Sequence, residues 1–369
     1  MVNETNTNNN TKVPPIGNIL AMAKQAKASD VHITVGVEPK ARINGKLVTM
    51  QNVSPLTPSI TKKMASDILS ESQADIFSEK GEIDTSISIP GCGRFRVNVF
   101  KQRGSVAMSF RIVDSEIPEP EKLGLPYSVT ELYKKKRGLI LVTGPTGSGK
   151  STTLATIIDI INKNRQAHII TLEDPIEYIH NHNRSIVNQR EIGMDSQSYA
   201  AALRAALRED PDVILVGEMR DFETISVAVT AAETGHLVLS TLHTIGAAST
   251  VDRIIDVFPT HQQQQIRVQL ASVLEAVISQ QLIPTKDNRG RVAAMEIMHS
   301  TPAIKNLIRE GKTHQIISTM QTSKKNGMIT MDDAIMTLLK NEKISQEQAI
   351  THAVDKESFA NKLGLQTTK

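Results

Sequence analysis

The segment GPTGSGKS, residues 144–151, constrains the fold of this 369-residue chain more than any other feature. It matches the pattern G-x-x-x-x-G-K-[ST] and lies between an apolar run, GLILVT, and a second run, TTLATIIDIINK. In this pattern the glycines let backbone N–H groups curl around phosphate oxygens at the N-terminus of a helix. The sequence therefore predicts a strand, a phosphate-binding loop and a helix, in that order.

The side chains of this loop predict a nucleoside triphosphate, ATP, as ligand and Mg²⁺ as its companion ion. Lys150 can reach the β- and γ-phosphates, and the Ser151 hydroxyl can hold Mg²⁺. The residues expected to contact the nucleotide are Gly144, Pro145, Thr146, Gly147, Ser148, Gly149, Lys150, Ser151 and Thr152.

Four apolar runs in the second half of the chain read as buried parallel strands: GLILVTG, AHIITLED, DVILVGE and GHLVLSTLH. Helical patterns separate them, so we expect an α/β domain over residues 138–369. After about residue 265 the pattern favours a mostly helical C-terminal part.

Acidic residues follow two of these runs, where the carboxyl ends of parallel strands meet a ligand. Glu218 ends DVILVGE and is the candidate general base for the attacking water, which it could also link to Mg²⁺. Gly217 precedes it where many such enzymes carry a metal-binding Asp. Glu173 and Asp174 end HIITLED and could orient water or metal. A helix-capping role for Glu218 and an ordinary strand-end role for the other pair are the alternatives.

Two histidines flank the run LVLSTL. His243 follows it and could contact the γ-phosphate, whereas His236 precedes it. For each of them a structural role, in which the side chain simply satisfies local hydrogen bonds, is the alternative.

The first half of the chain has a different pattern. Residues 1–13 are rich in Asn and Thr and are expected to be disordered. Residues 14–113 predict an antiparallel α+β domain: a helix over 16–28, a hairpin at Asn44-Gly45, and alternating strands over 82–89, 94–100 and 106–113. The alternation places Arg96 and Arg111 on the polar side, where they could stabilise phosphoryl charge or form a solvated face.

Residues 114–126 contain three prolines and four acids and read as a linker, followed by a short basic helix over 128–137. Net charge of +3 and the absence of Trp disfavour a dedicated nucleic-acid binder. The one cysteine, Cys92, excludes an internal disulfide and a four-cysteine zinc site. The polar N-terminus is unlike a signal peptide, and no run is apolar enough to span a membrane.

Taken together, these motifs resemble the PilT family of type IV pilus retraction, or twitching motility, ATPases. The resemblance covers nearly the whole chain from about residue 15. It rests on ASDVHITVG, RFRVNVF, GPTGSGKST, ITLEDPIEY, DPDVILVGEMRD, TGHLVLSTLHT and AIKNLIREGK. In the last run Lys305 replaces the family's middle arginine, which keeps the charge but loses bidentate pairing.

The resemblance implies a PAS-like N-terminal domain joined to a RecA-like ATPase domain. It implies a homohexamer in the cytoplasm, peripheral to the inner face of the cell membrane at the pilus base, working with an inner-membrane platform protein and the pilus machinery. Matched residue by residue, the nucleotide-closing arginines correspond to Arg96 and Arg111, with Arg103 less firmly placed. The catalytic and acid-box glutamates correspond to Glu218 and Glu173, and the histidine pair to His236 and His243.

Other functions remain open from the sequence. A pilus extension or type II secretion ATPase shares this core but usually adds a longer N-terminal region and a four-cysteine insertion. An accessory retraction ATPase is a second relative. A RecA-like nucleic-acid translocase is the alternative from another class, and a small-molecule kinase with the same loop is a further one. The origin of the arginines, in the same or a neighbouring subunit, also stays open.

Overall fold

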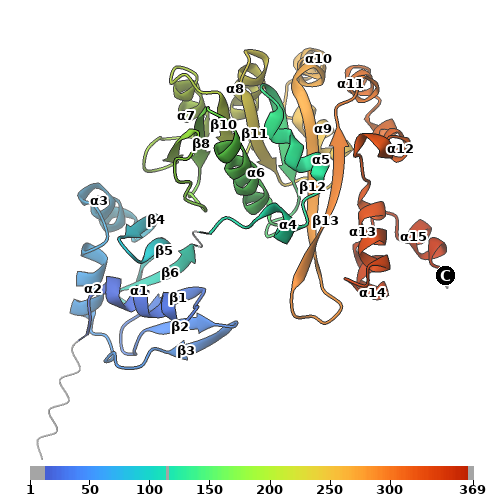
Figure 1. Cartoon of the computed structure of the whole chain (residues 1–369). Helices are drawn as coiled ribbons and strands as arrows, with labels where there is room; N and C mark the ends of the chain where they lie inside the picture. Colours follow the sequence, from blue (N-terminus) through green and yellow to red (C-terminus); the bar gives the residue numbers. More distant parts are fainter. Residues whose placement is uncertain (1–12, 114–115, 365–369) are drawn as a thin grey trace, which may run out of the picture. The chain divides into compact units, whose positions relative to one another are not determined.

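The computed structural model describes residues 13–113 and 116–364. The chain divides into two compact units, one ending at Glu116 and the other beginning at Ile117 (Figure 1). Most of the segment expected to be disordered, residues 1–12, lies outside the described residues, as do 114–115 of the expected linker.

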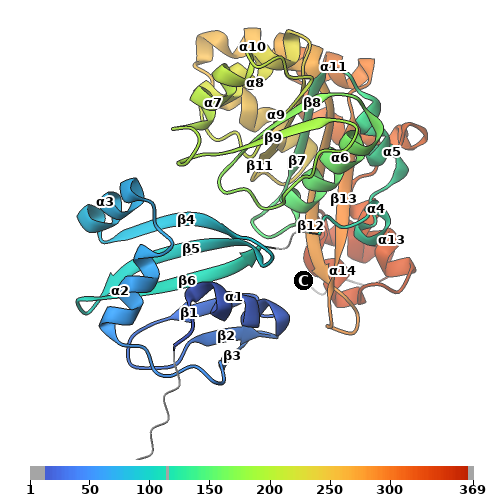
Figure 2. The same cartoon turned by 60° about the vertical axis from the view of Figure 1, so that its left-hand side comes forward.

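The first unit is a six-stranded antiparallel sheet with helices packed on it (Figure 2). The strand order is β3-β2-β1-β6-β5-β4. The strands are β1 (Asp30–Ile33), β2 (Lys40–Ile43), β3 (Lys46–Thr49), β4 (Glu82–Ile89), β5 (Gly93–Gln102) and β6 (Ser105–Val113). The helices are α1 (Ile16–Gln25), α2 (Pro58–Ser66) and α3 (Glu71–Lys80).

Alternation along the strands divides this sheet into a buried face and a polar face. Phe95, Val97 and Val99 of β5 are completely buried and pack with Phe110 of β6 and with Ile19 and other residues of α1. The residues between them point to the other side, as period-two patterning requires. The antiparallel α+β domain predicted from the sequence, with its hairpin at Asn44-Gly45, is therefore present.

The second unit is built on a seven-stranded sheet in the order β13-β12-β7-β11-β10-β8-β9. Its strands are parallel except for the edge strand β13. They are β7 (Gly138–Thr143), β8 (His168–Glu173), β9 (Ile186–Glu191), β10 (Val213–Val216), β11 (Leu237–Leu242), β12 (Leu274–Pro284) and β13 (Arg291–His299).

Helices cover both faces of this sheet, as buried parallel strands require. On one side α6 packs on Ile140 and Val142 of β7, and on the other α7 to α10 pack on Leu139 and Leu141. The helices are α4 (Pro120–Leu123), α5 (Tyr127–Thr130), α6 (Lys150–Asn164), α7 (Tyr199–Ala206), α8 (Phe222–Glu233), α9 (Ala247–Asp256), α10 (Gln263–Val273), α11 (Pro302–Arg309), α12 (Ile316–Thr322), α13 (Met331–Lys340), α14 (Gln346–His352) and α15 (Lys356–Lys362).

The expectation of a mostly helical chain after residue 265 is wrong for 274–299. The segment LEAVISQQLIP forms β12, which extends the sheet beside β7, and β13 returns antiparallel to it. Burial explains the error: β12 has neighbours on both sides and both faces, so its residues show no clean alternation, and a short apolar run can fit either structure. From α11 onward the described chain is helical, apart from short connections and an isolated bridge at Ile329.

The expected linker also differs from the structure. Residues from Ile117 onward belong to the second unit, where the Thr156 hydroxyl of α6 donates to the Pro118 carbonyl at 3.1 Å and Leu125 joins the core beside α6. The basic helix expected over 128–137 is two short turns, α5 and a 3₁₀ turn over Glu131–Lys134. Among the described residues, none of the helices combines the length and apolar character needed to span a bilayer.

We predict that Ile157 of α6 carries far more of the folding free energy than Ile160 on the same helix. Ile157 is completely buried in the core, whereas Ile160 is partly exposed. Ile157→Ala should cost about 2–5 kcal/mol of unfolding free energy, and the control Ile160→Ala at most about 1 kcal/mol. Denaturant unfolding of both variants measures this, and equal losses would contradict the packing of α6.

Candidate functional site

The phosphate-binding loop connects the buried strand β7 to α6, as the sequence predicts. Gly144, Gly147 and Gly149 have φ of 142°, 78° and 88°, a region that residues with a Cβ rarely adopt. A Cβ on Gly144 would lie 2.1 Å from the Gln280 carbonyl oxygen, so this position has no room for one. The glycines of the motif thus allow the loop to turn and, at Gly144, allow the loop backbone to approach β12 closely.

Lys150 opens α6 with its ammonium turned into the loop. Its Nζ donates to the carbonyl oxygens of Gly144 and Pro145 at 3.0 and 3.1 Å, and the residue is only 9% exposed. Burial lowers the pKa of Lys150, an effect that the nearby carboxylates of Glu177 and Glu218 partly oppose. The loop therefore holds a cation where the motif requires one to meet phosphate.

Ser151 and Thr152 follow in the first turn of α6. Ser151 is half-buried, and the Thr152 hydroxyl lies 3.0 Å from the Tyr178 hydroxyl. Pro145, Thr146 and Gly147 form the exposed tip of the loop, whereas Ser148 is buried.

Glu218 follows β10 and meets two basic residues. Its Oε2 lies 2.7 Å from Arg220 Nε and 3.5 Å from His243 Nε2, and its side chain is 20% exposed. A pocket of about 370 Å³ opens here, lined by Glu218, Met219, Arg220, Thr241, Leu242, His243, Thr244 and Arg253. The structure thus brings together the candidate base and the candidate phosphate-contacting histidine at the carboxyl ends of neighbouring strands.

Gly217 is glycine for a steric reason that the sequence did not reveal. A Cβ there would lie 2.7 Å from the Tyr199 hydroxyl and 3.2 Å from the Leu172 carbonyl oxygen of β8. An aspartate at this position would therefore displace Tyr199. Burial, reinforced by the charges of Glu218 and Asp174, raises the pKa of Tyr199, so its hydroxyl keeps its proton.

Glu173 ends β8 in a hydrogen-bonded, half-buried setting. Its Oε1 accepts from the Thr171 hydroxyl at 2.6 Å and from Gln189 Nε2 at 3.2 Å. Burial raises the pKa of Glu173 even though these two bonds oppose the shift. Gln189 on β9 and Tyr199 on α7 lie beside this candidate site, and sequence reasoning missed both because a single amide or phenol belongs to no motif.

His236 lies elsewhere in the unit. It precedes β11, and its Nδ1 lies 3.0 Å from the Ala231 carbonyl oxygen near the end of α8. His243 follows the other end of the same strand, and a six-residue strand spans roughly 20 Å. The two histidines are therefore not brought together within one chain.

Arg96 and Arg111 are partners in register on β5 and β6, and both are exposed on the polar face of the first unit. Arg111 Nε donates to Asp30 Oδ1 at 3.1 Å, whereas Arg96 makes no ion pair among the described residues. Arg103 lies in the exposed turn between these strands with φ of 49°.

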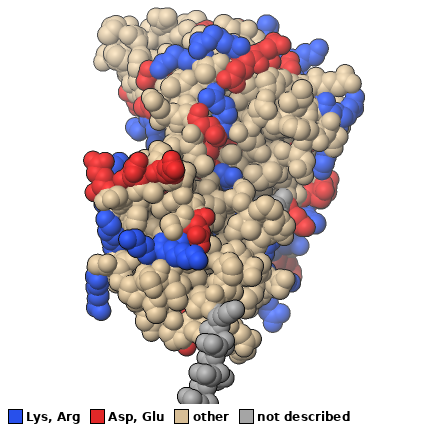
Figure 3. Space-filling model, turned by 90° about the vertical axis from the view of Figure 1, so that its left-hand side faces the viewer, with Lys and Arg blue, Asp and Glu red and all other residues tan. Residues whose placement is uncertain are grey.

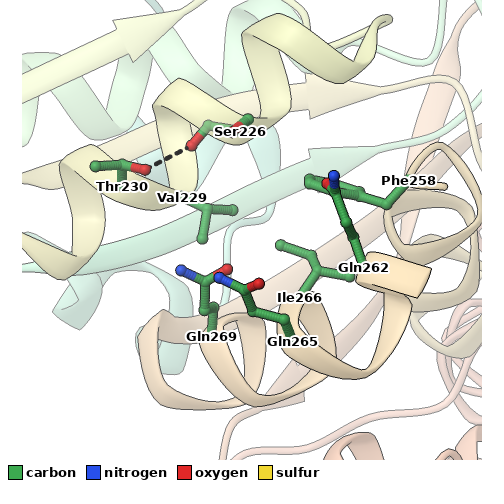
Figure 4. Close-up of a pocket in the computed structure, with 8 residues that line it drawn as sticks. All are labelled: Ser226, Val229, Thr230, Phe258, Gln262, Gln265, Ile266 and Gln269. Carbon is green, nitrogen blue, oxygen red and sulfur yellow. Dashed lines mark hydrogen bonds between the residues drawn. The ribbon is translucent and has the colours of Figure 1, made fainter. Parts of the chain in front are cut away.

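A second pocket, of about 190 Å³, lies between α8 and α10 (Figure 4). Its lining side chains are Ser226, Val229, Thr230, Phe258, Gln262, Gln265, Ile266 and Gln269. None of these eight ionises near neutral pH, so the catalytic candidates remain those around the loop and Glu218.

Comparisons with known proteins agree with this geometry. Residues 6–354 match the model of the type II/IV secretion system protein family. A type IV pilus retraction ATPase, PilT, of Pseudomonas aeruginosa is 47% identical over 93% of this chain and 99% of its own length. The chain belongs to the type II/IV secretion system protein family. It is an ATPase of the PilT type, which confirms the resemblance drawn from the motifs.

Two further relatives point the same way. A twitching motility protein of Neisseria gonorrhoeae is 47% identical over 87% of this chain and 86% of that protein. A crystal structure of the pilus retraction motor PilT with bound ADP superposes with a TM-score of 0.88 at 50% identity, covering 94% of this chain and 98% of that one. The two-part fold, an N-terminal domain followed by an ATPase domain, is thereby confirmed.

We predict that substitution by Ala destabilises the fold more at Gly144 than at Gly147. Ala at 147 meets no atom within 4 Å, so Gly147→Ala should cost only the backbone strain, about 1–2 kcal/mol. Gly144→Ala must also displace the β12 backbone and should be clearly less stable. Thermal unfolding without nucleotide compares them, and equal shifts in Tm would contradict the close approach of Gly144 to β12.

Proposed function

We propose that this protein is a motor that hydrolyses ATP to power retraction and disassembly of a type IV pilus. The observation that carries the proposal is near full-length similarity to a retraction ATPase combined with an intact loop, lysine and glutamate at the expected strand ends. The chemistry is transfer of the γ-phosphoryl group of ATP to water.

In this proposal the loop N–H groups and Lys150 bind the phosphates, and Glu218 accepts the proton of the attacking water. The contacts of Glu218 support this role, because Arg220 and His243 hold its carboxylate at one edge of an open pocket. Glu173 orients water near the phosphates from its half-buried position at the end of β8. His243 lies beside Glu218, and we propose that it responds to the γ-phosphate, whereas a role for His236 remains a prediction.

The residues present fit a Mg²⁺ ion that is held largely by the nucleotide. Among the described residues there is no cluster of three or more His, Cys, Asp or Glu that would cage a metal. Mg²⁺ bound to nucleotides keeps several waters and needs only one or two protein oxygens besides phosphate, and the Ser151 hydroxyl supplies one, with Glu218 acting through water. When bound, the ion neutralises charge on the phosphates.

Arg96 and Arg111, with Arg103 as a further candidate, are proposed to add positive charge to the nucleotide. Support comes from Arg96, whose guanidinium has no carboxylate partner in the described chain and stands opposite a second arginine. A guanidinium in this setting is available to an anion.

We further propose that the chain works as a homohexamer in the cytoplasm, peripheral to the inner face of the membrane at the pilus base, with an inner-membrane platform protein as partner. No direct nucleic-acid partner is proposed. On the face shown in Figure 3, basic side chains lie in small groups interspersed with acidic ones, unlike the continuous basic track of a nucleic-acid binder.

Two substitutions should separate binding from chemistry. Lys150→Ala removes the cation from the phosphates and should abolish most ATP binding. Glu218→Gln preserves size and polarity, so it should bind ATP normally while turnover falls roughly 10²–10⁴-fold. Nucleotide titration and phosphate release measure the two effects, and a Glu218→Gln variant with parental turnover would remove Glu218 from the role of base.

Deleting the gene tests the direction of work. If the motor retracts pili, the deletion strain should carry excess surface pili and lose twitching motility, and expression of the Glu218→Gln variant should not restore it. Electron microscopy of surface pili is the measurement. Cells without pili would instead identify an extension motor.

A further inference from the structure

Gln280 contacts the phosphate-binding loop from a distant part of the sequence. It lies on β12, immediately after the stretch that pairs with β7, and is 2% exposed. Its Nε2 donates to the Ser148 carbonyl oxygen at 2.6 Å, and its Oε1 accepts from the Thr153 hydroxyl of α6 at 2.9 Å. One buried amide thus joins the loop, the helix after it and the neighbouring strand.

The bond to Ser148 determines the direction of the next backbone N–H. In a trans peptide the carbonyl and the following N–H point in opposite directions. Because Gln280 holds the Ser148 carbonyl toward β12, the N–H of Gly149 points away from β12. Within the described part of the chain this N–H donates to no acceptor, which is the state expected of a group reserved for a phosphate oxygen.

We propose that Gln280 is a positioning residue for nucleotide binding, which orients the Gly149 N–H toward the phosphates by holding the Ser148 carbonyl. The inference rests on the proposed placement of ATP at this loop. The amide is suited to the task because a single side chain must both donate to the loop carbonyl and accept from Thr153. Neither a carboxylate nor an apolar side chain can do both.

The bond should act on binding rather than on the chemical step. A backbone N–H that contacts the phosphates does so before and during phosphoryl transfer, so its loss raises KM and leaves kcat nearly unchanged. A residue with only a structural role would instead reduce the amount of folded, active enzyme and leave KM as it was.

The test uses the full-length protein and two substitutions at this position. Gln280→Glu keeps the size and the acceptor for Thr153 but replaces the donor, and Gln280→Met keeps the shape without either bond. Gln281→Met is the matched control, because Gln281 is the next residue of β12 and bonds instead to His352 at the end of α14. Calorimetric titration with ADP and steady-state ATP hydrolysis are measured for each.

We expect both Gln280 variants to bind ADP roughly 10- to 100-fold more weakly, the range for one hydrogen bond to a charged group. KM for ATP should rise by a factor similar to the loss of ADP affinity, while kcat stays within about threefold of the parental value. Gln281→Met should match the parent in both constants and in ADP affinity. Parental ADP affinity in Gln280→Glu would overturn the proposal. So would a lower kcat at unchanged KM, or loss of the fold in both variants by circular dichroism without nucleotide.

Lys150→Ala in the same titration separates this inference from the proposed function. If it binds ADP as well as the parent, the nucleotide is not on this loop and the proposed function fails. If the parent binds ADP and Lys150→Ala does not, the nucleotide is on this loop, and the affinities of the Gln280 variants then test the role of Gln280 alone.

Discussion

The approach of the Gly144 backbone to β12 is the constraint on which the nucleotide site depends. With the Gln280 carbonyl at 2.1 Å from where a Cβ would be, only glycine fits, and the chain must leave β7 in a conformation that other residues avoid. The same approach brings the Gln280 side chain to Ser148 and Thr153. The pairing of β12 with β7 thereby determines the shape of a loop that has no regular structure of its own.

A second buried group links the His243 end of the site to the C-terminal helices. Glu296 on β13 is 2% exposed, and its two oxygens accept from the backbone N–H groups of Ala247 and Met331 at 2.7 and 3.2 Å. These are the first residues of α9 and α13, where a carboxylate is favoured by the helix dipole. The Glu296 side chain thus connects the start of α9, which follows the loop after β11, directly to the start of α13.

The sequence predicts the local structure around this candidate site well where the motif fixes particular residues in a particular order. The loop, Lys150 and the strand before Glu218 follow from local pattern, and the structure contains the loop, the buried lysine and that strand, which ends at Val216. Gln280 and Tyr199 could not be found this way, because their contacts with the site are made by residues far from it in the sequence and exist only in the folded chain. The same is true of β12, whose burial on both faces removes the periodicity that would have distinguished it from a helix.

Two arginines face each other on the polar face of the sheet in the first unit. Arg96 and Arg111 lie directly opposite each other, an arrangement of like charges that costs stability in a sheet. Asp30, in register with Arg111 on β1, offsets one of the two charges and also lies 3.8 Å from Arg42. Partial burial opposes ionisation of Asp30, but hydrogen bonds from the Ser29 hydroxyl and from Arg111, together with the charge of Arg111, lower the pKa of that carboxyl. In the cluster formed by Asp30, Arg42, Arg96 and Arg111, one carboxylate therefore meets three guanidiniums, and the cluster keeps an excess of positive charge. Because like charges in register disfavour folding, this excess supports the proposed role of Arg96 and Arg111 beside an anionic ligand, whose charge would offset theirs.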